Sequence, residues 1–139
     1  MSRCGYSDAL DQWDLIRWRG QVASAIRGKR GQAFLRELLA ALDTMPEKRL
    51  IAHDLQDATG AVCTLGSIGM ARGLELGKLD PEAHEHLGGV FGIAHQLVQE
   101  IEFENDEGMY QESPEQRWER MRWWVMQQLR GVATGEEPQ

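Results

Sequence analysis

The sequence is poor in cysteine and proline and has no long apolar run. Its 139 residues include four prolines and two cysteines, Cys4 and Cys63. Two cysteines outside a C-x-x-C pair do not make a disulfide framework. The apolar runs cover only a few residues, whereas a membrane-spanning helix needs about 20, and residues 1–10 have no apolar signal-peptide core. We therefore predict a soluble cytosolic protein with reduced thiols and no membrane partner.

Net positive charge is also absent. The chain has 15 Lys and Arg residues against 22 Asp and Glu residues, which gives a net charge of −7. This excludes a globally basic nucleic-acid coat but leaves a local basic patch open. The hydrophobic content of 42% is too high for intrinsic disorder, and the length suits one domain. We predict a single compact domain over residues 1–131 and a flexible polar tail over residues 132–139.

Helical spacing of apolar residues dominates the first part of the chain. It predicts a first helix over Asp8–Arg27, with Ser7 as the N-cap. The glycines of the segment Arg27–Gly31 end that helix and leave room for the next one. A second helix is predicted over Gln32–Asp43, and the two together form an αα-hairpin.

The middle of the chain has the pattern of a small β-hairpin. The segments Arg49–Leu55 and Ala61–Leu65 are short and mixed apolar, and Gln56–Gly60 between them carries turn residues. Two to four further helices are predicted after this hairpin. The best defined is Pro114–Arg130, which has Ser113 as its N-cap and proline at its first position. The expected fold class is α+β, predominantly helical.

A basic segment is the clearest candidate binding site. Lys29 is followed by Arg30 rather than Ser or Thr, which excludes a Walker A loop. The break between the first two helices would nevertheless favour an anion, because backbone N–H groups and the helix dipole point there. A phosphate, a carboxylate or an acidic protein surface would fit; alternatively, the cations pair with the protein's own acids or lie in solvent. Residues 17–36 hold six cations and no acid: Arg17, Arg19, Arg27, Lys29, Arg30 and Arg36.

An acidic segment is the counterpart of the basic one. It could bind a divalent cation, form a solvated surface or pair with the basic segment. Its spacing does not match an EF-hand loop, so we predict no metal and no cofactor. A metal-dependent enzyme that uses His95 and these acids is kept as a third reading. Residues 100–116 hold seven acids and no cation: Glu100, Glu102, Glu104, Asp106, Glu107, Glu112 and Glu115.

Tryptophan is abundant, with five residues in two segments that also carry arginine. Aromatic and arginine side chains together stack on bases or form the hot spots of protein interfaces, although the helical spacing also suits core packing. We therefore add Trp18, Arg120 and Trp123 to the candidate partner-binding residues. Exposure of Trp18 or Trp123 would indicate a homodimer or another partner surface.

Several segments resemble a known group of proteins. The resemblance is to small uncharacterised proteins encoded by tailed bacteriophages and prophages, and it covers most of the chain. It implies expression in a bacterial cytoplasm, where small phage proteins often bind host machinery, including defence systems. It supplies no catalytic residue. The segments that carry it are Arg27–Arg36, Met45–Ala52, Phe91–Ala94, Asn105–Glu107 and Ser113–Trp118.

The sequence thus favours a binding protein over an enzyme. The leading hypothesis is a non-enzymatic, phage-derived protein of the host bacterial cytoplasm that binds an acidic or phosphorylated host protein. In its sharpest form this protein inhibits a host defence or regulatory protein. The alternative is binding or sequestration of a nucleotide or nucleic acid at Arg27–Gly31. No catalytic residue is predicted, and the pattern leaves the enzyme question open.

Overall fold

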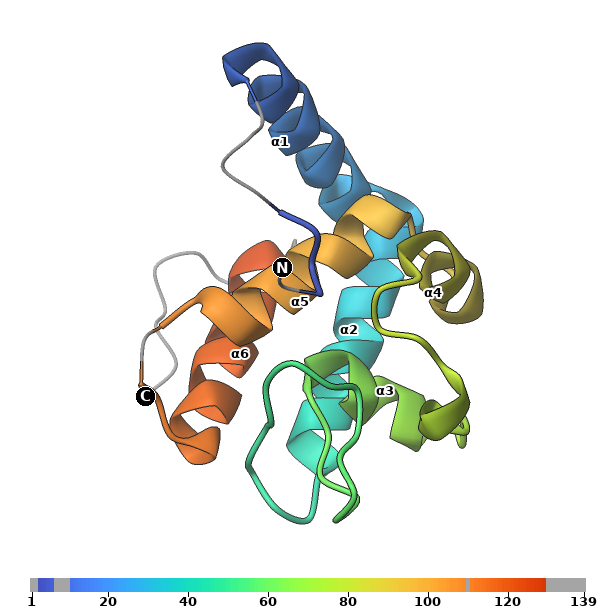
Figure 1. The fold of residues 1–139 in the computed structure, drawn as a ribbon, viewed down its shortest axis with the longest axis vertical. Coiled ribbons are helices and arrows are strands. Elements are labelled where there is room, and N and C mark those ends of the chain that lie inside the picture. Colours follow the sequence, from blue (N-terminus) through green and yellow to red (C-terminus); the bar gives the residue numbers. More distant parts are fainter. Residues whose placement is uncertain (1–2, 7–10, 110, 130–139) are drawn as a thin grey trace.

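The structure is helical throughout the part that it describes. The computed structural model describes residues 3–6, 11–109 and 111–129. Figure 1 shows α2 in the middle of the molecule, with α6 on one side and α3 and α4 on the other. The elements are α1 (Gln12–Arg27), α2 (Lys29–Thr44), α3 (Thr64–Ala71), the 3-10 helix η1 (Leu76–Lys78), α4 (His84–Phe91), α5 (His95–Glu107) and α6 (Pro114–Gln128).

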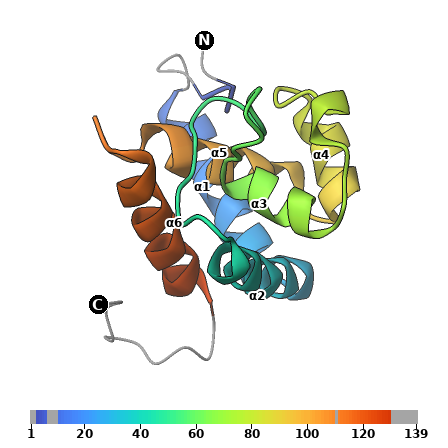
Figure 2. The same ribbon diagram turned by 90° about the horizontal axis from the view of Figure 1, so that it is seen from below.

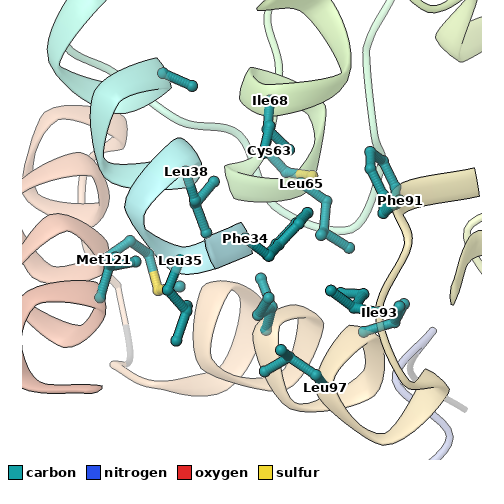
Figure 3. Packing of buried hydrophobic residues seen from close by; sticks show 14 of the residues in the cluster. Phe34, Leu35, Leu38, Cys63, Leu65, Ile68, Phe91, Ile93, Leu97 and Met121 are labelled. Atoms are coloured by element: carbon teal, nitrogen blue, oxygen red, sulfur yellow. The ribbon is translucent and has the colours of Figure 1, made fainter. Parts of the chain in front are cut away.

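Helix α2 supplies the centre of the apolar core. Its side chains at Phe34, Leu35 and Leu38 point between α6 and the α3–α4 region (Figure 3). Leu35 and Leu38 are fully buried, and burial of such a side chain stabilises the fold by roughly 1.5–3 kcal/mol. Seen from below, α3 lies in the centre, surrounded by α2, α4, α5 and α6 (Figure 2), which fits the burial of Thr64 to Gly69.

The predicted start of the last helix is confirmed. The Ser113 side chain accepts a hydrogen bond from the Gln116 backbone, and the Gln116 side chain accepts one from the Ser113 backbone. This capping box satisfies backbone donors that the helix itself leaves free. The predicted end at Arg130, the predicted cap Ser7 and the tail over residues 132–139 lie outside the described residues, so the domain boundary at 131 stays a prediction.

The break between α1 and α2 is a single residue. Gly28 is at once the C-cap of α1 and the N-cap of α2, so Lys29 and Arg30 lie in the first turn of α2 rather than in a loop. The two helices do not form an antiparallel pair: α1 extends away from the end of the other helices (Figure 1). The helices approach most closely at Gly31, where an added Cβ would overlap the Ala25 carbonyl oxygen.

The predicted β-hairpin and the α+β class are wrong. The described residues contain no strand, and Gln56 and Val62 form one isolated antiparallel bridge. The turn was placed correctly, because Asp57 accepts hydrogen bonds from Thr59 and from the Ala61 backbone.

The arms of this turn do not continue as a ladder. The Leu50 N–H donates outside the segment, to the Pro114 carbonyl oxygen at 3.0 Å. His53 has a φ of 74°, which breaks the extended course of the first arm. The second arm turns into α3 after Cys63. The apolar residues of the segment are buried against helices instead of against each other in a sheet.

The close approach at Gly31 gives a test of the junction. Gly31→Ala would force the Ala25 carbonyl and the start of α2 apart, so we expect the free energy of unfolding to fall by about 3 kcal/mol. Gly89→Ala is the matched control, because nothing lies within 4 Å of a Cβ at this second helical glycine; it should stabilise by about 0.5–1 kcal/mol. Chemical denaturation of both variants measures this, and equal effects would contradict the proposed clash.

Candidate functional site

A group of unpaired cations surrounds the start of α2. We call this group the basic face and define it as Arg27, Lys29, Arg30 and Arg36. All four are exposed, and the described part of the chain offers none of them an ion-pair partner within 4.0 Å. Lys29 and Arg36 are seven residues apart, so they share one side of α2 about 10 Å along its axis.

The acids next to the basic face are neutralised. Glu37 receives two hydrogen bonds from Arg72, at 2.7 and 2.8 Å. Hydrogen bonding to Arg72 holds the pKa of Glu37 below its ordinary value. Asp43 is bound by Arg122, with Nε 2.6 Å from Oδ1. The outer side of α2 therefore carries an excess of positive charge although the whole chain is acidic.

The N-terminus of α2 adds to this positive charge. It has no side-chain cap and no acid in its first turn, so its backbone N–H groups and dipole add to the charge of Lys29 and Arg30. A hollow of about 220 Å³ lies beside it, between the ends of α1 and α2 and Ala94. This volume is below the roughly 300–1,000 Å³ of most small-molecule sites.

Three other candidate binding residues, all on α1, have partners within the chain. Arg19 binds Glu100 of α5 through two hydrogen bonds, at 2.8 and 3.1 Å. The Trp18 Nε1–H donates to the Tyr6 hydroxyl at 2.8 Å, and the two rings meet edge to face. Arg17 pairs with Asp14 on the exposed side of the helix. Trp18 and Arg19 thus hold α1 against its neighbours.

The nominated residues of α6 differ from each other. Arg120 binds Glu112 through two nitrogens and donates to the carbonyl oxygens of Glu104 and Asn105. It therefore closes the C-terminal end of α5. Trp123 is 38% exposed and remains a candidate contact residue.

Most of the acidic segment turns inward. Glu100 and Glu102 are buried, and the side chains of Asp106 and Glu112 are 0% and 1% exposed. Of the basic segment, Arg19 alone reaches this group among the described residues. The other basic side chains around it come from elsewhere in the chain and are Arg3, His53, His84, Arg117 and Arg120.

A buried charge cluster forms where the N-terminal segment meets α5. The Arg3 guanidinium binds Asp106 in a bidentate manner, at 2.6 and 2.9 Å. It also lies 3.6 Å from the Cys63 sulfur and 4.0 Å from Glu102. Burial disfavours the charged form of Asp106, but the hydrogen bonds and charge of Arg3 outweigh it, and the pKa of that carboxyl lies below its ordinary value.

Glu102 is the least satisfied member of this cluster. One nitrogen of His84, Nε2, is 2.6 Å from the Arg3 carbonyl oxygen and 2.9 Å from Glu102 Oε1. One N–H cannot point well at both oxygens, so we assign it to the carbonyl. No well-aligned donor among the described residues then reaches either Glu102 oxygen. Burial raises the pKa of Glu102 to about 8, against the opposing charge of Arg3.

This cluster was not predicted from the sequence, although α5 carries a signal for it. The apolar stripe of α5 includes Val98 and Ile101, and Glu102 and Asn105 lie four residues after them on the same side of the helix. Asn105 is fully buried and its Oδ1 accepts from Thr64 Oγ1 at 2.7 Å. Polar residues in register with an apolar stripe thus indicated a buried polar cluster. Arg3 had no comparable signal.

The chemistry open to the cluster is limited by burial. Both cysteines are buried and neither is in a disulfide, and Cys63 accepts a hydrogen bond from the Gly66 backbone as the N-cap of α3. Within the described ranges, no group of three or more His, Cys, Asp or Glu side chains is placed to hold a metal ion. The cluster connects the N-terminal segment to α5 and lies away from solvent.

Comparison with known proteins adds no relative. No family model, curated protein or solved structure matches the chain. The resemblance to phage and prophage proteins therefore stays a prediction. None of the helices in the described ranges has the length and apolar character needed to cross a membrane.

Removal of Arg3 should reveal how much the buried cluster depends on it. Arg3→Met leaves the Asp106 carboxylate buried without its cation, so we expect a loss of about 3–5 kcal/mol in unfolding free energy. The double variant Arg3→Met/Asp106→Asn should recover most of this loss. Denaturant titration of the two singles and the double gives the coupling, and additive effects would contradict a direct interaction.

Glu102 should make stability depend on pH. Its pKa rises on folding from 4.5 to about 8, so the folded state binds the proton more tightly. The stabilisation is complete below pH 4.5 and is lost as pH rises through 8, with a slope of up to about 1.4 kcal/mol per pH unit. Asp106 acts oppositely, because its depressed pKa removes stability only as pH falls below its ordinary value of 3.8.

Glu102→Gln should flatten this decline between pH 4.5 and 8. Arg3, His84 and Asp106 face the same carboxyl and remain in the variant. The exposed substitution Glu115→Gln serves as control and should leave the profile as in the wild type. Unfolding free energies measured at half-unit pH steps decide the matter, and an unchanged slope in Glu102→Gln would exclude Glu102 as its source.

Proposed function

We propose that this protein is a non-enzymatic binding protein of phage or prophage origin that docks its basic face on an acidic surface of a host bacterial protein. The complex would form in the host cytoplasm and would inhibit a defence or regulatory protein. The phage origin and the host partner rest on the sequence resemblance. The mode of binding rests on the basic face.

The observation that carries the proposal is that none of the four cations has an ion-pair partner among the described residues. Elsewhere, buried acids are paired with arginines, as in Arg19–Glu100 and Arg120–Glu112, and the acids adjacent to the basic face are paired as well. The charge of the basic face is therefore available to an external anionic group. Arginine also favours bidentate contact with carboxylates and phosphates.

The shape of the basic face favours a protein partner over a nucleotide. Small exposed residues, Ala33 and Ala40, lie between and beyond the cations on the outer side of α2, so a helix or loop can approach closely. The hollow at the start of α2 is small for a nucleotide. A spread of charge along two turns suits several carboxylates on a protein surface better than one phosphate group.

Charge reversal on the basic face tests the proposal. Arg30→Glu/Arg36→Glu should reduce capture of the partner from a bacterial host extract at least tenfold, because like charges would then face each other. Capture by the wild type should also weaken as salt rises from 0.05 to about 0.5 M, since exposed charges are screened. Quantitative pull-down with mass spectrometry measures both.

The matched control carries the same change of charge elsewhere. Arg49→Glu/Lys78→Glu alters two exposed cations away from the basic face and should keep capture intact. When each variant is expressed in the host, the wild type and the control should affect defence or growth, and Arg30→Glu/Arg36→Glu should not. Equal behaviour of the wild type and Arg30→Glu/Arg36→Glu, in capture and in cells, would refute the proposal.

A further inference from the structure

A continuous groove runs along α1. Its first part lies beside Asp14 and Gln21, its middle beside Gly20 and Ser24, and its last part beside Lys29 at the start of α2. Neighbouring parts share residues, so the hollows follow one another along the helix. The middle part has a volume of about 600 Å³, is wide open to solvent, and is bordered on the far side by Ala94 and by Gln96 of α5.

The exposed side of α1 carries large apolar side chains near its start and small residues further along. Trp13 is 75% exposed and Ile16 is 55% exposed, although such side chains are usually buried in a folded domain. Further along, nothing lies within 4 Å of a Cβ built at Gly20. Helix α1 buries a single residue, Val22, within its own chain. Among the described residues, nothing covers the outer side of α1, which is thus an unpartnered helix face.

The charges along the groove are arranged with opposite signs at its two ends. Asp11 and Asp14 lie at the start of α1, where Arg17 pairs with Asp14 and leaves Asp11 as the unpaired acid among the described residues, whereas Arg27, Lys29 and Arg30 lie at the far end. A partner that runs antiparallel to α1 must be basic where α1 begins and acidic where it ends. Helix α1 itself has this polarity when reversed, and the groove follows it from Asp14 to the start of α2.

We propose that α1 of a second copy of this chain occupies the groove, in an antiparallel two-fold dimer. Residues seven positions on either side of Gly20 then meet their counterparts across the axis. Trp13 of one protomer lies against Arg27 of its partner, where a cation–π contact forms, and Gly20 lies against Gly20. Each protomer contributes the same patch, as an isologous interface requires.

The small residues at the centre decide how closely the helices approach. Gly20 and Ser24 lie four residues apart on the outer side of α1, so two backbones pack without long side chains between them. The acidic start of each helix meets Lys29 and Arg30 of the other protomer. A contact made by one helix from each protomer is at the lower end of specific interfaces in area. We therefore expect a dissociation constant of about 1–100 µM.

The dimer goes beyond the proposed function and fails separately from it. Arg36 lies on the outer side of α2, outside the residues that line the groove. A monomeric chain that still captures an acidic partner through Arg30 and Arg36 removes the dimer alone. A dimer that captures no partner leaves the groove assignment intact and removes the proposed function.

The decisive variant is Gly20→Gln. In the monomer it replaces an exposed helical glycine with a better helix former, so the monomer should become slightly more stable. In the dimer the new side chains collide at the axis, and the dissociation constant should rise at least tenfold. Gly89→Gln changes another exposed helical glycine with free space around its Cβ, lies outside the groove, and should dimerise as the wild type does.

Sedimentation equilibrium from about 1 µM to 1 mM follows the mass from 15.7 kDa towards twice that value. Lys29 lies opposite Asp11 in this register, so Asp11→Lys should weaken the dimer, and Asp11→Lys/Lys29→Asp should restore it. A wild type that stays monomeric at all concentrations overturns the proposal. So does a dimer that Gly20→Gln leaves unchanged, or one that Gly20→Gln and Gly89→Gln weaken equally, since its interface then lies elsewhere.

Discussion

Helix α5 carries carboxylates into the interior, and the rest of the molecule is arranged to satisfy them. An isolated ionised carboxylate in a protein interior is strongly unfavourable. Glu100 therefore holds Arg19, which fixes α1, and Asp106 holds Arg3, which fixes the N-terminal segment. Glu102 has no such bidentate partner, and the result is its raised pKa.

This internal pairing explains how an acidic chain presents a basic face. The net charge of −7 is a sum over groups whose fields do not reach equally far. The fields of two paired charges largely cancel a short distance away from the pair. At physiological salt, an exposed unpaired charge acts over about 8 Å. A ligand near Lys29 and Arg36 therefore meets local cations rather than the total charge of the chain.

The sequence predicted helices better than it predicted partners. The capping residues Ser113 and Gln116 marked the start of α6, and Gly28 lies in the break predicted between the first two helices. The hairpin prediction failed because the arms beside the Asp57 turn share a few backbone hydrogen bonds, such as that from the Ile51 N–H to the Val62 carbonyl oxygen, but form no ladder. A donor on the first arm instead bonds across the molecule to Pro114, a tertiary contact that composition does not reveal.

The fate of each charge follows from its register relative to an apolar stripe rather than from the charge run in which it lies. Arg19 precedes the buried Val22 by three residues, so it faces α5 and forms an ion pair with Glu100. Arg36 shares one side of α2 with the exposed residues Ala33 and Ala40, away from the core, and it stays exposed. Both belong to one basic run, and a helical wheel separates them. The same reasoning places Glu102, four residues after Val98, inside. Charged residues that share a helix face with buried apolar residues form pairs inside the protein. The remaining charged residues are the ones that indicate an external binding surface.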